Sequence, residues 1–278
     1  MIARSWSCGS ERVRPKRSLG QHFLHDPRIL GRIAAALPLA PGVPVVEIGP
    51  GRGALTAALR ERGAVVTAIE KDAALLAGLR VRFPDLRLAH ADALEADWRA
   101  LAGVEQGPWL VAGNIPYNIT SPLLERALRP PRPSAIVFLV QREVADRLAA
   151  SPGTREYGAL TVGVRVVARV ERLFTVPPGA FQPPPRVDSA VVRLTPLAAP
   201  LIPDAAVRSF RRLVTGLFAA RRKQLGRAVR QLTGWEPDRV GPLLAALGLE
   251  ATRRPETLTP AEFVGLHRRL VDGGYGAG

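Results

Sequence analysis

Apolar residues along this chain fall into two kinds of run. Some runs are short and continuous, such as 43–48 and 109–114, and are bounded by glycine, proline or polar residues, a pattern typical of buried strands. In the others, apolar residues recur at every third or fourth position, which is typical of amphipathic helices. The two kinds alternate from residue 26 to about residue 195, with short links between them.

The alternation predicts a fold class. We expect strands at 43–48, 65–70, 86–92, 109–114, 135–141, 170–176 and 189–194, and helices at 26–37, 53–62, 73–82, 97–102, 121–128, 143–150 and 159–167. Asp26 is the expected N-cap of the first helix, with Pro27 in its first turn. Strands and helices in this order indicate a doubly wound, mostly parallel α/β sheet.

The pattern changes near residues 196–200, and from about residue 203 only helix signals remain. We therefore predict three parts: a basic N-terminal arm at 1–18, an α/β domain at 19–202 and a small helical domain at 203–278. A chain of 278 residues is long enough for one large and one small domain.

Composition narrows the class of protein. With 47% hydrophobic and 23% charged residues the chain has the makeup of a folded protein, and no apolar run approaches the ~18 residues that would span a bilayer. The N-terminus leads into charged residues and not into a signal core, and the single cysteine, Cys8, cannot form an internal disulfide. We therefore expect a cytoplasmic protein.

The net charge of +15 favours a polyanionic partner, with nucleic acid first and an anionic membrane surface second. Nearly all of the cations are arginines, since the only lysines are Lys16, Lys71 and Lys223. A GC-rich genome would explain arginine in place of lysine, but it would not explain the excess of base over acid. Nucleic acid is therefore the first partner that the charge predicts.

A glycine-rich turn follows the first of the central strands. The sequence Gly49-Pro50-Gly51-Arg52-Gly53 leads into a helix, and glycines let a ligand approach the backbone where no Cβ is tolerated. Taken alone, the pattern also fits a dinucleotide fingerprint. Glu70 ends the next strand, where its carboxylate is placed to bind two ribose hydroxyls of either a nicotinamide or an adenosyl cofactor.

The later strands separate these two cofactors. Asp92 ends the third strand, where it could accept from an adenine amino group, and Asn114 ends the fourth. With Glu47 and Glu70 they form a predicted rim of polar strand ends around one ligand, although each residue alone would pass as a strand-end cap. Hydride transfer needs a proton-handling group, and none of the four histidines is convincingly placed for it (His22, His25, His90 and His267). We therefore expect S-adenosylmethionine and not a nicotinamide.

Both asparagines of the chain lie in one turn, Asn114-Ile115-Pro116-Tyr117-Asn118, directly after the fourth strand. The turn offers an amide oxygen, a backbone carbonyl and an aromatic face, which suits a planar nucleobase amine that is to receive a methyl group. The alternative is an ordinary Asn-Pro turn between a strand and a helix. The place of the turn at a strand end of an open α/β sheet favours a ligand site.

Together these motifs resemble the ribosomal RNA adenine dimethyltransferase family, and closely its bacterial small-subunit branch. The resemblance spans about residues 14–270, and it is carried in the family's order by Leu19-Gly20-Gln21-His22-Phe23-Leu24, Val46-Glu47-Ile48-Gly49-Pro50-Gly51, Glu70-Lys71-Asp72, Ala91-Asp92-Ala93, Asn114-Ile115-Pro116-Tyr117, Phe181-Gln182-Pro183-Pro184-Pro185 and Arg221-Arg222-Lys223. Ile115, where the family often has leucine, and His22, where some members have asparagine, look like mild variants.

The resemblance implies a seven-stranded, Rossmann-like methyltransferase fold with a C-terminal helical RNA-binding domain, and S-adenosyl-L-methionine as methyl donor. It implies an enzyme of ribosome biogenesis that dimethylates the N6 amine of two adjacent adenosines in the 3′-terminal hairpin loop of 16S (small-subunit) rRNA. The cofactor contacts that the family motifs imply are His22, Leu24, Gly49, Gly51, Glu70, Lys71, Asp92, Ala93 and Asn114.

The turn also predicts how methyl transfer would proceed. The Asn114 side-chain oxygen and the Ile115 carbonyl would accept the two N–H groups of the adenine amine. Pro116 would limit the freedom of the turn, and Tyr117 would stack on the base. No metal and no dedicated general base are expected. Phe181 is a candidate for the opposite face of the base, and the alternative is a core residue that anchors a stiff loop.

Between residues 208 and 230 the chain carries many basic residues and no acidic one. On one helical wheel the apolar residues cluster on one face, and the basic residues fall broadly opposite. We predict that this face binds RNA phosphates through residues that include Arg221, Arg222, Lys223, Arg227 and Arg230, together with Arg12, Arg14, Lys16 and Arg17 of the arm. The alternative is a plain solvated face of a helical domain.

Two other functions stay open at this point. The chain could be a large-subunit rRNA adenine N6-methyltransferase of the antibiotic-resistance type, which the full proline-rich motif and the long C-terminal region argue against. It could also be a non-catalytic nucleic-acid-binding factor on the same fold, which the intact turn at 114–117 and the complete glycine loop oppose. The expected partner is small-subunit rRNA or a 30S assembly intermediate, with no membrane, and we expect a monomer.

Overall fold

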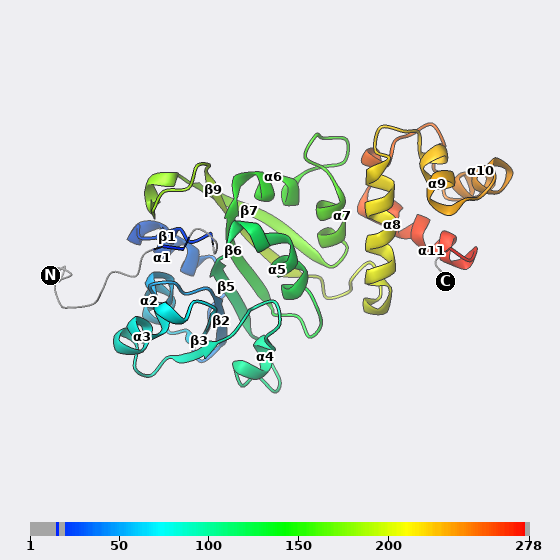
Figure 1. The fold of residues 1–278 in the computed structure, drawn as a ribbon. Helices are drawn as coiled ribbons and strands as arrows, with labels where there is room; N and C mark the ends of the chain where they lie inside the picture. The colour runs from blue at the N-terminus through cyan, green and yellow to red at the C-terminus, as the bar shows by residue number, and fades with distance from the viewer. Residues whose placement is uncertain (1–14, 17–19, 276–278) are drawn as a thin grey trace. The chain divides into compact units, whose positions relative to one another are not determined.

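In the computed structural model, which describes residues 15–16 and 20–275, the chain forms a seven-stranded sheet (Figure 1). The strand order is β4 (Arg87–His90), β3 (Val65–Glu70), β2 (Pro44–Ile48), β5 (Leu110–Asn114), β6 (Ala135–Gln141), β9 (Ser189–Pro196) and β7 (Ala168–Val176). A second sheet pairs β1 (Phe23–Leu24) antiparallel with β8 (Phe181–Gln182). The predicted α/β class with a seven-stranded sheet is confirmed, whereas the short β1–β8 pair was not predicted.

The strand order reverses at β2. This strand pairs in parallel with β3 on one side and with β5 on the other, and β3 pairs in parallel with β4. The carboxyl ends of these four strands therefore lie at one edge of the sheet, and the crevice beside such a reversal is where open α/β sheets bind ligands. Val46 and Val111, which face each other in register, are both fully buried. Burial on both faces of the sheet explains the continuous apolar runs in the sequence.

Helices alternate with the strands along the chain: α1 (Pro27–Ala35), α2 (Ala54–Glu61), α3 (Ala73–Arg82), α4 (Trp98–Leu101), α5 (Thr120–Ala127), α6 (Arg142–Ala149) and α7 (Ala159–Arg165). α2 packs against α1 and β3, and α3 packs against β3 and β4. Asp26 caps α1 as predicted, because its Oδ1 accepts the backbone N–H groups of Arg28 and Ile29.

After β9 the described chain contains helices only: α8 (Val207–Ala219), α9 (Leu225–Thr233), α10 (Pro237–Ala246) and α11 (Pro260–Asp272), with short 3-10 turns. The expectation of one helical wheel for the whole basic run is wrong, because α8 ends at Ala219 and α9 begins at Leu225. A backbone contact between residues that are distant in sequence fixes this break. The N–H of Leu225 donates to the carbonyl of Arg253 at 2.6 Å, so the chain turns before it enters α9.

The chain divides into two compact units. The first comprises the residues up to 120 with 137–139 and 176–189, and the second comprises 121–136, 140–175 and the residues from 190 onwards. This division does not follow the predicted boundary at 202/203, so separate domains there remain a prediction. No helix in the described part of the chain is long and apolar enough to cross a membrane.

Candidate functional site

A pocket lies at the carboxyl ends of β2, β3, β4 and β5, where the strand order reverses. Its lining brings together most of the predicted site: His22, Gly49, Gly51, Glu70, Lys71, Asp92, Ala93, Asn114, Ile115, Pro116 and Tyr117. It also includes residues that were not predicted as ligand contacts, among them Gln21, Ile48, Ile69, Leu75 and Asn118. The apolar members close the pocket between the polar strand ends.

The glycine turn after β2 has a backbone that only glycine adopts easily. Gly49 and Gly51 have φ angles of +65° and +58°, in the left-handed region. A Cβ on Gly51 would also lie 3.0 Å from the ring of Phe23. The N–H of Gly49 donates to the carbonyl of Ile69 at 2.9 Å, which fixes the turn to β3. The turn therefore presents bare backbone to the pocket.

Glu70 lies at the end of β3 and is 6% exposed. Its Oε2 accepts the N–H of Gly51 at 3.2 Å, and its Oε1 accepts the N–H of Asp72 at 2.8 Å. Burial raises the pKa of Glu70, and these two backbone donors act against that rise. A carboxylate oxygen can accept two hydrogen bonds, so both oxygens keep capacity for a pair of ligand hydroxyls.

Asp92, beyond the end of β4, is held by a charge partner. Lys71 Nζ lies 2.6 Å from its Oδ2, and the N–H of Leu94 donates to its Oδ1 at 2.9 Å. The hydrogen bond from Lys71 lowers the pKa of Asp92 below its ordinary value. The carboxylate therefore stays ionised at the pocket edge, where it can accept from an amino group.

A strap of residues 20–23 forms one wall of the pocket and is fastened by a buried carboxylate. Asp72 has no exposed side-chain surface; its oxygens accept from Lys16 Nζ at 2.6 Å and from Gln21 Nε2 at 2.9 Å. Burial acts to raise the pKa of Asp72, but these donors and the N–H of Ala74 together lower it. Gln21 and Asp72 belong to two of the sequence motifs, but the contact between them was not predicted.

The turn after β5 orients the Asn114 amide. Its Nδ2 donates to the carbonyl of His22 in the strap at 2.8 Å, so Oδ1 is the end left to face a ligand. Within the described chain, neither Asn114 Oδ1 nor the Ile115 carbonyl accepts a hydrogen bond. Ile115 is 1% exposed and its N–H donates to the carbonyl of Leu139 at 3.3 Å. Two acceptors are therefore held rigidly side by side in the chain.

Tyr117 is half-buried and fixed at both ends of its side chain. Its hydroxyl lies 2.6 Å from Ser189 Oγ. Its ring stacks against that of His22, with centroids 5.7 Å apart and an angle of 24° between the planes. Burial raises the pKa of Tyr117, so the hydroxyl stays neutral near pH 7. The ring is thus a held aromatic surface at the pocket. Ser189 was not predicted as part of the site.

Three predicted residues lie outside the pocket lining. Leu24 and Phe181 are paired across β1 and β8 and are 6% and 3% exposed. The burial of Phe181 agrees with the alternative interpretation, an anchor for a stiff loop, and a stacking role for it stays a prediction. Glu47 is 1% exposed and accepts from Thr56 Oγ1 at 2.6 Å, so its inclusion in the rim is wrong. Neighbouring side chains of a strand point to opposite faces, and Ile48 is the β2 residue that faces the pocket.

The predicted RNA-binding run 221–223 lies in the turn between α8 and α9. Arg221 is engaged by Glu256, with Nε 2.6 Å from Oε2, and so is not a free cation. Arg222 is exposed, and Lys223 Nζ donates to Gln231 Oε1 at 2.5 Å. Of the predicted arm contacts, Lys16 binds Asp72, and Arg12, Arg14 and Arg17 lie outside the described residues.

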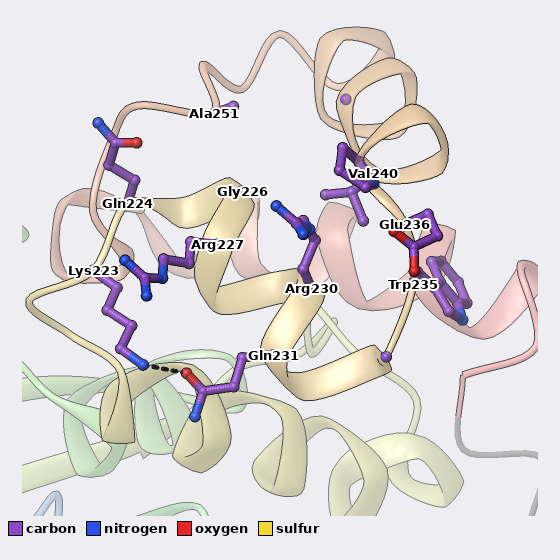
Figure 2. A pocket seen from close by; sticks show the side chains of 13 residues that line it. Lys223, Gln224, Gly226, Arg227, Arg230, Gln231, Trp235, Glu236, Val240 and Ala251 are labelled. Carbon is purple, nitrogen blue, oxygen red and sulfur yellow. Dashed lines mark hydrogen bonds between the residues drawn. The ribbon is translucent and has the colours of Figure 1, made fainter.

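Lys223 lines a second pocket, a groove between α9 and α10 with a volume of about 860 Å³ (Figure 2). We call it the α9–α10 groove. Two further cations, Arg227 and Arg230, project from α9 into its lining. Both arginines were predicted to lie on a basic face, but a concave site was not predicted.

A doubly wound sheet with a glycine turn, two strand-end carboxylates and an Asn-Ile-Pro-Tyr turn at its switch point is the arrangement of an S-adenosylmethionine-dependent methyltransferase. The family of ribosomal RNA adenine dimethylases matches residues 12–238. The ribosomal RNA small subunit methyltransferase A of Geobacter metallireducens is 42% identical over 94% of this chain and 97% of its own length. The protein of that name in Laribacter hongkongensis is 44% identical over 92% of this chain and 95% of its own length.

Solved structures agree with this assignment. The 23S rRNA methyltransferase ErmE superposes with a TM-score of 0.68 at 30% identity, covering 90% of this chain and 99% of its own. A dimethyladenosine transferase from Plasmodium falciparum superposes with a TM-score of 0.79 at 24% identity, covering 91% of this chain and 98% of its own, and supports the fold. The chain belongs to the ribosomal RNA adenine dimethylase family.

Proposed function

We propose that this protein transfers methyl groups from S-adenosylmethionine to the N6 amines of two adjacent adenosines in the 3′-terminal hairpin loop of 16S rRNA. The observation that carries the proposal is the Asn114 turn, whose two unoccupied acceptors lie at a pocket fit for an adenosyl cofactor. The small-subunit relatives support the choice of RNA. The protein acts as a cytoplasmic monomer on a 30S assembly intermediate during ribosome biogenesis.

The residues of the first pocket fit S-adenosylmethionine. Gly49 and Gly51 line the pocket with positive φ angles and no side chains, so the turn offers backbone to a ligand that must come close. Glu70 can accept from the two ribose hydroxyls, and Asp92 can accept from the adenine amino group. When bound, this cofactor supplies an electrophilic methyl group on a sulfonium centre.

The chain's own groups position the nucleophile. Asn114 Oδ1 and the Ile115 carbonyl accept the two N–H groups of the target adenine, which favours a pyramidal nitrogen and frees its lone pair for attack. Tyr117 offers its ring to the base. The hydrogen bond that fixes Asn114 to the His22 carbonyl is made before the base arrives, so little reorganisation accompanies the reaction. The cationic, methylated nitrogen that results would be acidic enough to lose its proton to water.

The second methyl transfer makes a weaker complex than the first. A monomethylated adenine has one N–H left, so one of the two acceptors loses its donor. Because the Ile115 carbonyl is fixed by the backbone and Asn114 by His22, neither can turn to find another partner.

An adenine within a helix or loop stack must also leave it to reach these groups.

The test uses methyl-labelled S-adenosylmethionine with undermethylated small-subunit particles and, separately, large-subunit rRNA. Nucleoside mass spectrometry resolves the products. We expect dimethyladenosine on the small-subunit RNA alone. Label on the large-subunit RNA would transfer the assignment to the large-subunit rRNA methyltransferases, to which the structural neighbour ErmE, a 23S rRNA methyltransferase, belongs. RNA binding without label on either substrate would indicate a non-catalytic factor.

A further inference from the structure

The α9–α10 groove has an excess of positive charge, with Lys223, Arg227 and Arg230 in its lining against one carboxylate, Glu236. Arg227 and Arg230 are exposed, and neither guanidinium has a hydrogen-bond or ion-pair partner among the described residues. Other arginines of this unit are engaged: Arg211 by Glu125 at 2.7 Å, Arg221 by Glu256 at 2.6 Å and Arg253 by Glu262 at 2.6 Å. The groove cations therefore stand apart as a pair that an external anion can bind.

The groove is held in shape by bonds that do not involve these cations. The N–H of Gly226, at the start of α9, donates to the carbonyl of Ala251 at 3.0 Å, which fixes one wall to the helix. A Cβ on Gly226 would lie 3.2 Å from the Cβ of Ala251, so the two segments are in close contact. Because this helix terminus already donates to backbone, the charge of the groove comes from its side chains.

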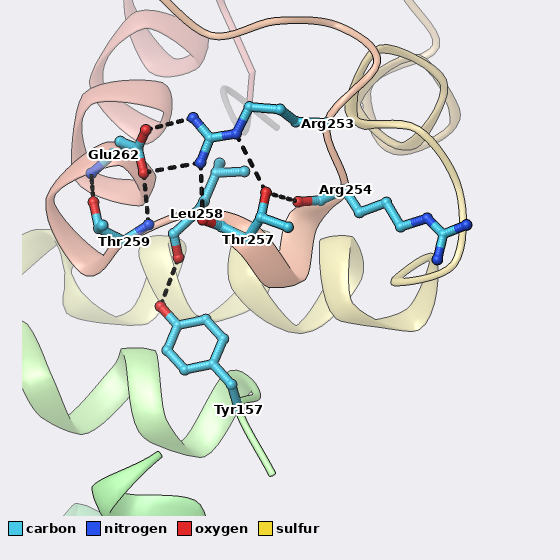
Figure 3. Close-up of polar contacts among 7 residues, drawn as sticks. All are labelled: Tyr157, Arg253, Arg254, Thr257, Leu258, Thr259 and Glu262. Atoms are coloured by element: carbon cyan, nitrogen blue, oxygen red, sulfur yellow. Dashed lines mark hydrogen bonds and ion pairs between the residues drawn. The ribbon is translucent and has the colours of Figure 1, made fainter. Parts of the chain in front are cut away.

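The segment that follows Ala251 is anchored in turn by a polar network (Figure 3). Arg253 reaches Glu262 at 2.6 Å and also donates to the Thr257 carbonyl at 2.8 Å. The buried hydroxyl of Tyr157 donates to the Leu258 carbonyl at 2.7 Å. The segment that brings Ala251 to the groove is thus fixed before any ligand arrives, which reduces the entropy cost of binding.

An apolar wall forms part of the lining. Pro237, Val240 and Ala251 belong to it, and Gly241 adds backbone without a side chain. A Cβ built on Gly241 meets no atom within 4 Å, so the space in front of it is open. At about 860 Å³ the groove falls in the range of sites for organic molecules and is far larger than a lone ion needs.

We propose that the α9–α10 groove binds one nucleotide of the RNA substrate that has turned out of its helix. Its two flanking phosphates lie at Arg227 and Arg230, whose guanidinium groups point to different sides of α9. Its base lies against the apolar wall before Gly241 and Ala251. Glu236, the one carboxylate in the lining, repels the phosphates from the α10 end and so fixes the direction in which the nucleotide enters. This subsite rests on the proposed function only in taking RNA as the polyanion.

Two kinds of variant separate the phosphate contact from the base contact. Arg227→Ala with Arg230→Ala removes the cations, and its control, Arg62→Ala with Arg80→Ala, removes the same charge from exposed arginines of the first unit. Gly241→Phe fills the space proposed for the base without changing the charge. Its control is Gly31→Phe, where a Cβ also meets no atom within 4 Å. Both glycines are helical, but Gly241 precedes Pro242, where a Cβ crowds the proline ring, so binding by Gly241→Phe is interpreted only if its melting temperature stays near that of the control.

Binding of each variant to small-subunit rRNA is measured over a series of KCl concentrations, with cofactor affinity and melting temperature as checks on folding. We expect the double arginine variant to lower the slope of log K against log salt by about one to two and to bind about tenfold more weakly at fixed salt. We expect Gly241→Phe to weaken binding by about fivefold or more, with the slope unchanged. Both controls should bind like the wild type.

Wild-type affinity for Gly241→Phe would show that no base enters the groove and would overturn the proposal. A double arginine variant that behaves like its charge-matched control would overturn it as well. A wild-type protein that binds the rRNA in the groove but transfers no methyl group would refute the proposed function and leave the subsite standing. Absence of any rRNA binding would refute both.

Discussion

The first pocket and the α9–α10 groove are both lined by charged side chains, but they treat charge in opposite ways. In the pocket both lining carboxylates have partners: Glu70 has two backbone N–H groups and Asp92 has a lysine. Asp72, which fastens the strap behind the pocket, has a lysine and a glutamine. In the groove Arg227 and Arg230 have none among the described residues. Charges of the pocket are largely buried or paired, whereas those of the groove are exposed.

This difference follows from what each site has to bind. A small ligand that is enclosed cannot supply charge to every wall, so the buried groups must be satisfied by the protein itself. A polyanion brings many phosphates, and cations left without partners gain their partners when it arrives. Paired charges therefore hold the groups of a site in fixed positions around a small ligand. Unpaired charges of one sign attract a ligand of the opposite charge. The following variants test whether the two sites keep these separate roles.

The largest effect is expected at the turn that carries the reaction. Asn114→Ala removes one of the two acceptors for the adenine amine, and we expect kcat to fall at least about a hundredfold while RNA affinity stays near wild type. The control is Asn118→Ala, the only other asparagine, which is exposed and also lines the pocket. Single-turnover methyl transfer and filter binding measure the two quantities. Loss of RNA binding in a folded Asn114→Ala protein would remove the assigned role.

Salt should separate the two sites in the wild-type protein. Raising KCl from about 50 to 200 mM should weaken rRNA binding on the order of a hundredfold, if four to five phosphates are contacted. Cofactor affinity should change by less than about twofold, because the charges of the pocket are already paired. Titration calorimetry with S-adenosylmethionine, beside rRNA binding at the same salt concentrations, makes the comparison. Equal salt dependence for both ligands would contradict the distinction between the sites.

The stability of the first unit should also depend on pH, through the buried carboxyl group of Glu47. Burial raises the pKa of Glu47 from 4.5 to about 7. The folded protein therefore holds this proton more tightly than the unfolded chain does. Its contribution to the free energy of unfolding is fully present below pH 4.5, and it is lost as pH rises towards and through 7, because the unfolded carboxyl ionises first. Glu47→Gln should remove this loss, which is about 3 kcal/mol in the free energy of unfolding by pH 8.

Denaturant unfolding at pH 4.5 and at pH 8 measures the effect of Glu47→Gln. The variant should gain stability relative to the wild type between the two pH values, and its amide oxygen can still accept from Thr56. Glu61→Gln, at an exposed site, is the control and should follow the wild type. Parallel pH profiles for all three proteins would show that Glu47 titrates at its ordinary pKa.

The smallest effect is expected at the strap. Lys16→Ala removes the cation that binds the buried Asp72, and because Lys16 is half-exposed we expect the loss to be up to about 1 kcal/mol. The dissociation constant for S-adenosylmethionine should then rise roughly fivefold, since Gln21 and His22 of the strap line the pocket. Lys223→Ala, in the groove, should leave cofactor affinity unchanged. If the strap does not depend on this ion pair, Lys16→Ala and Lys223→Ala should bind S-adenosylmethionine with equal affinity.

Much of the α/β fold could be predicted because its signals are local. Continuous apolar runs located the buried strands, and Asp26 with Pro27 marked the start of α1. The β1–β8 pair was missed because strands of two residues carry no periodicity. The break between α8 and α9 was missed because it depends on the carbonyl of Arg253, which is distant in sequence.

The candidate site divides in the same way. Glu70, Asp92 and Asn114 could be predicted because strand ends of a parallel sheet meet at one edge. The Asp72 contacts to Lys16 and Gln21 could not, because they join segments whose separation in space no pattern reveals. The groove was missed because a helical wheel describes the face of one helix and a cavity needs two.

The hydrogen bond from Asn114 to the His22 carbonyl has a consequence for how the protein would age. Hydrolysis of this one side-chain amide to a carboxylate would replace the donor by a second acceptor, so that two oxygens would face each other. The fold does not depend on that contact, since β5 and the Ile115 N–H are held by other bonds. A stored preparation could therefore remain folded and bind RNA while it loses its activity, and peptide mass spectrometry across residue 114 would distinguish this chemical loss from denaturation.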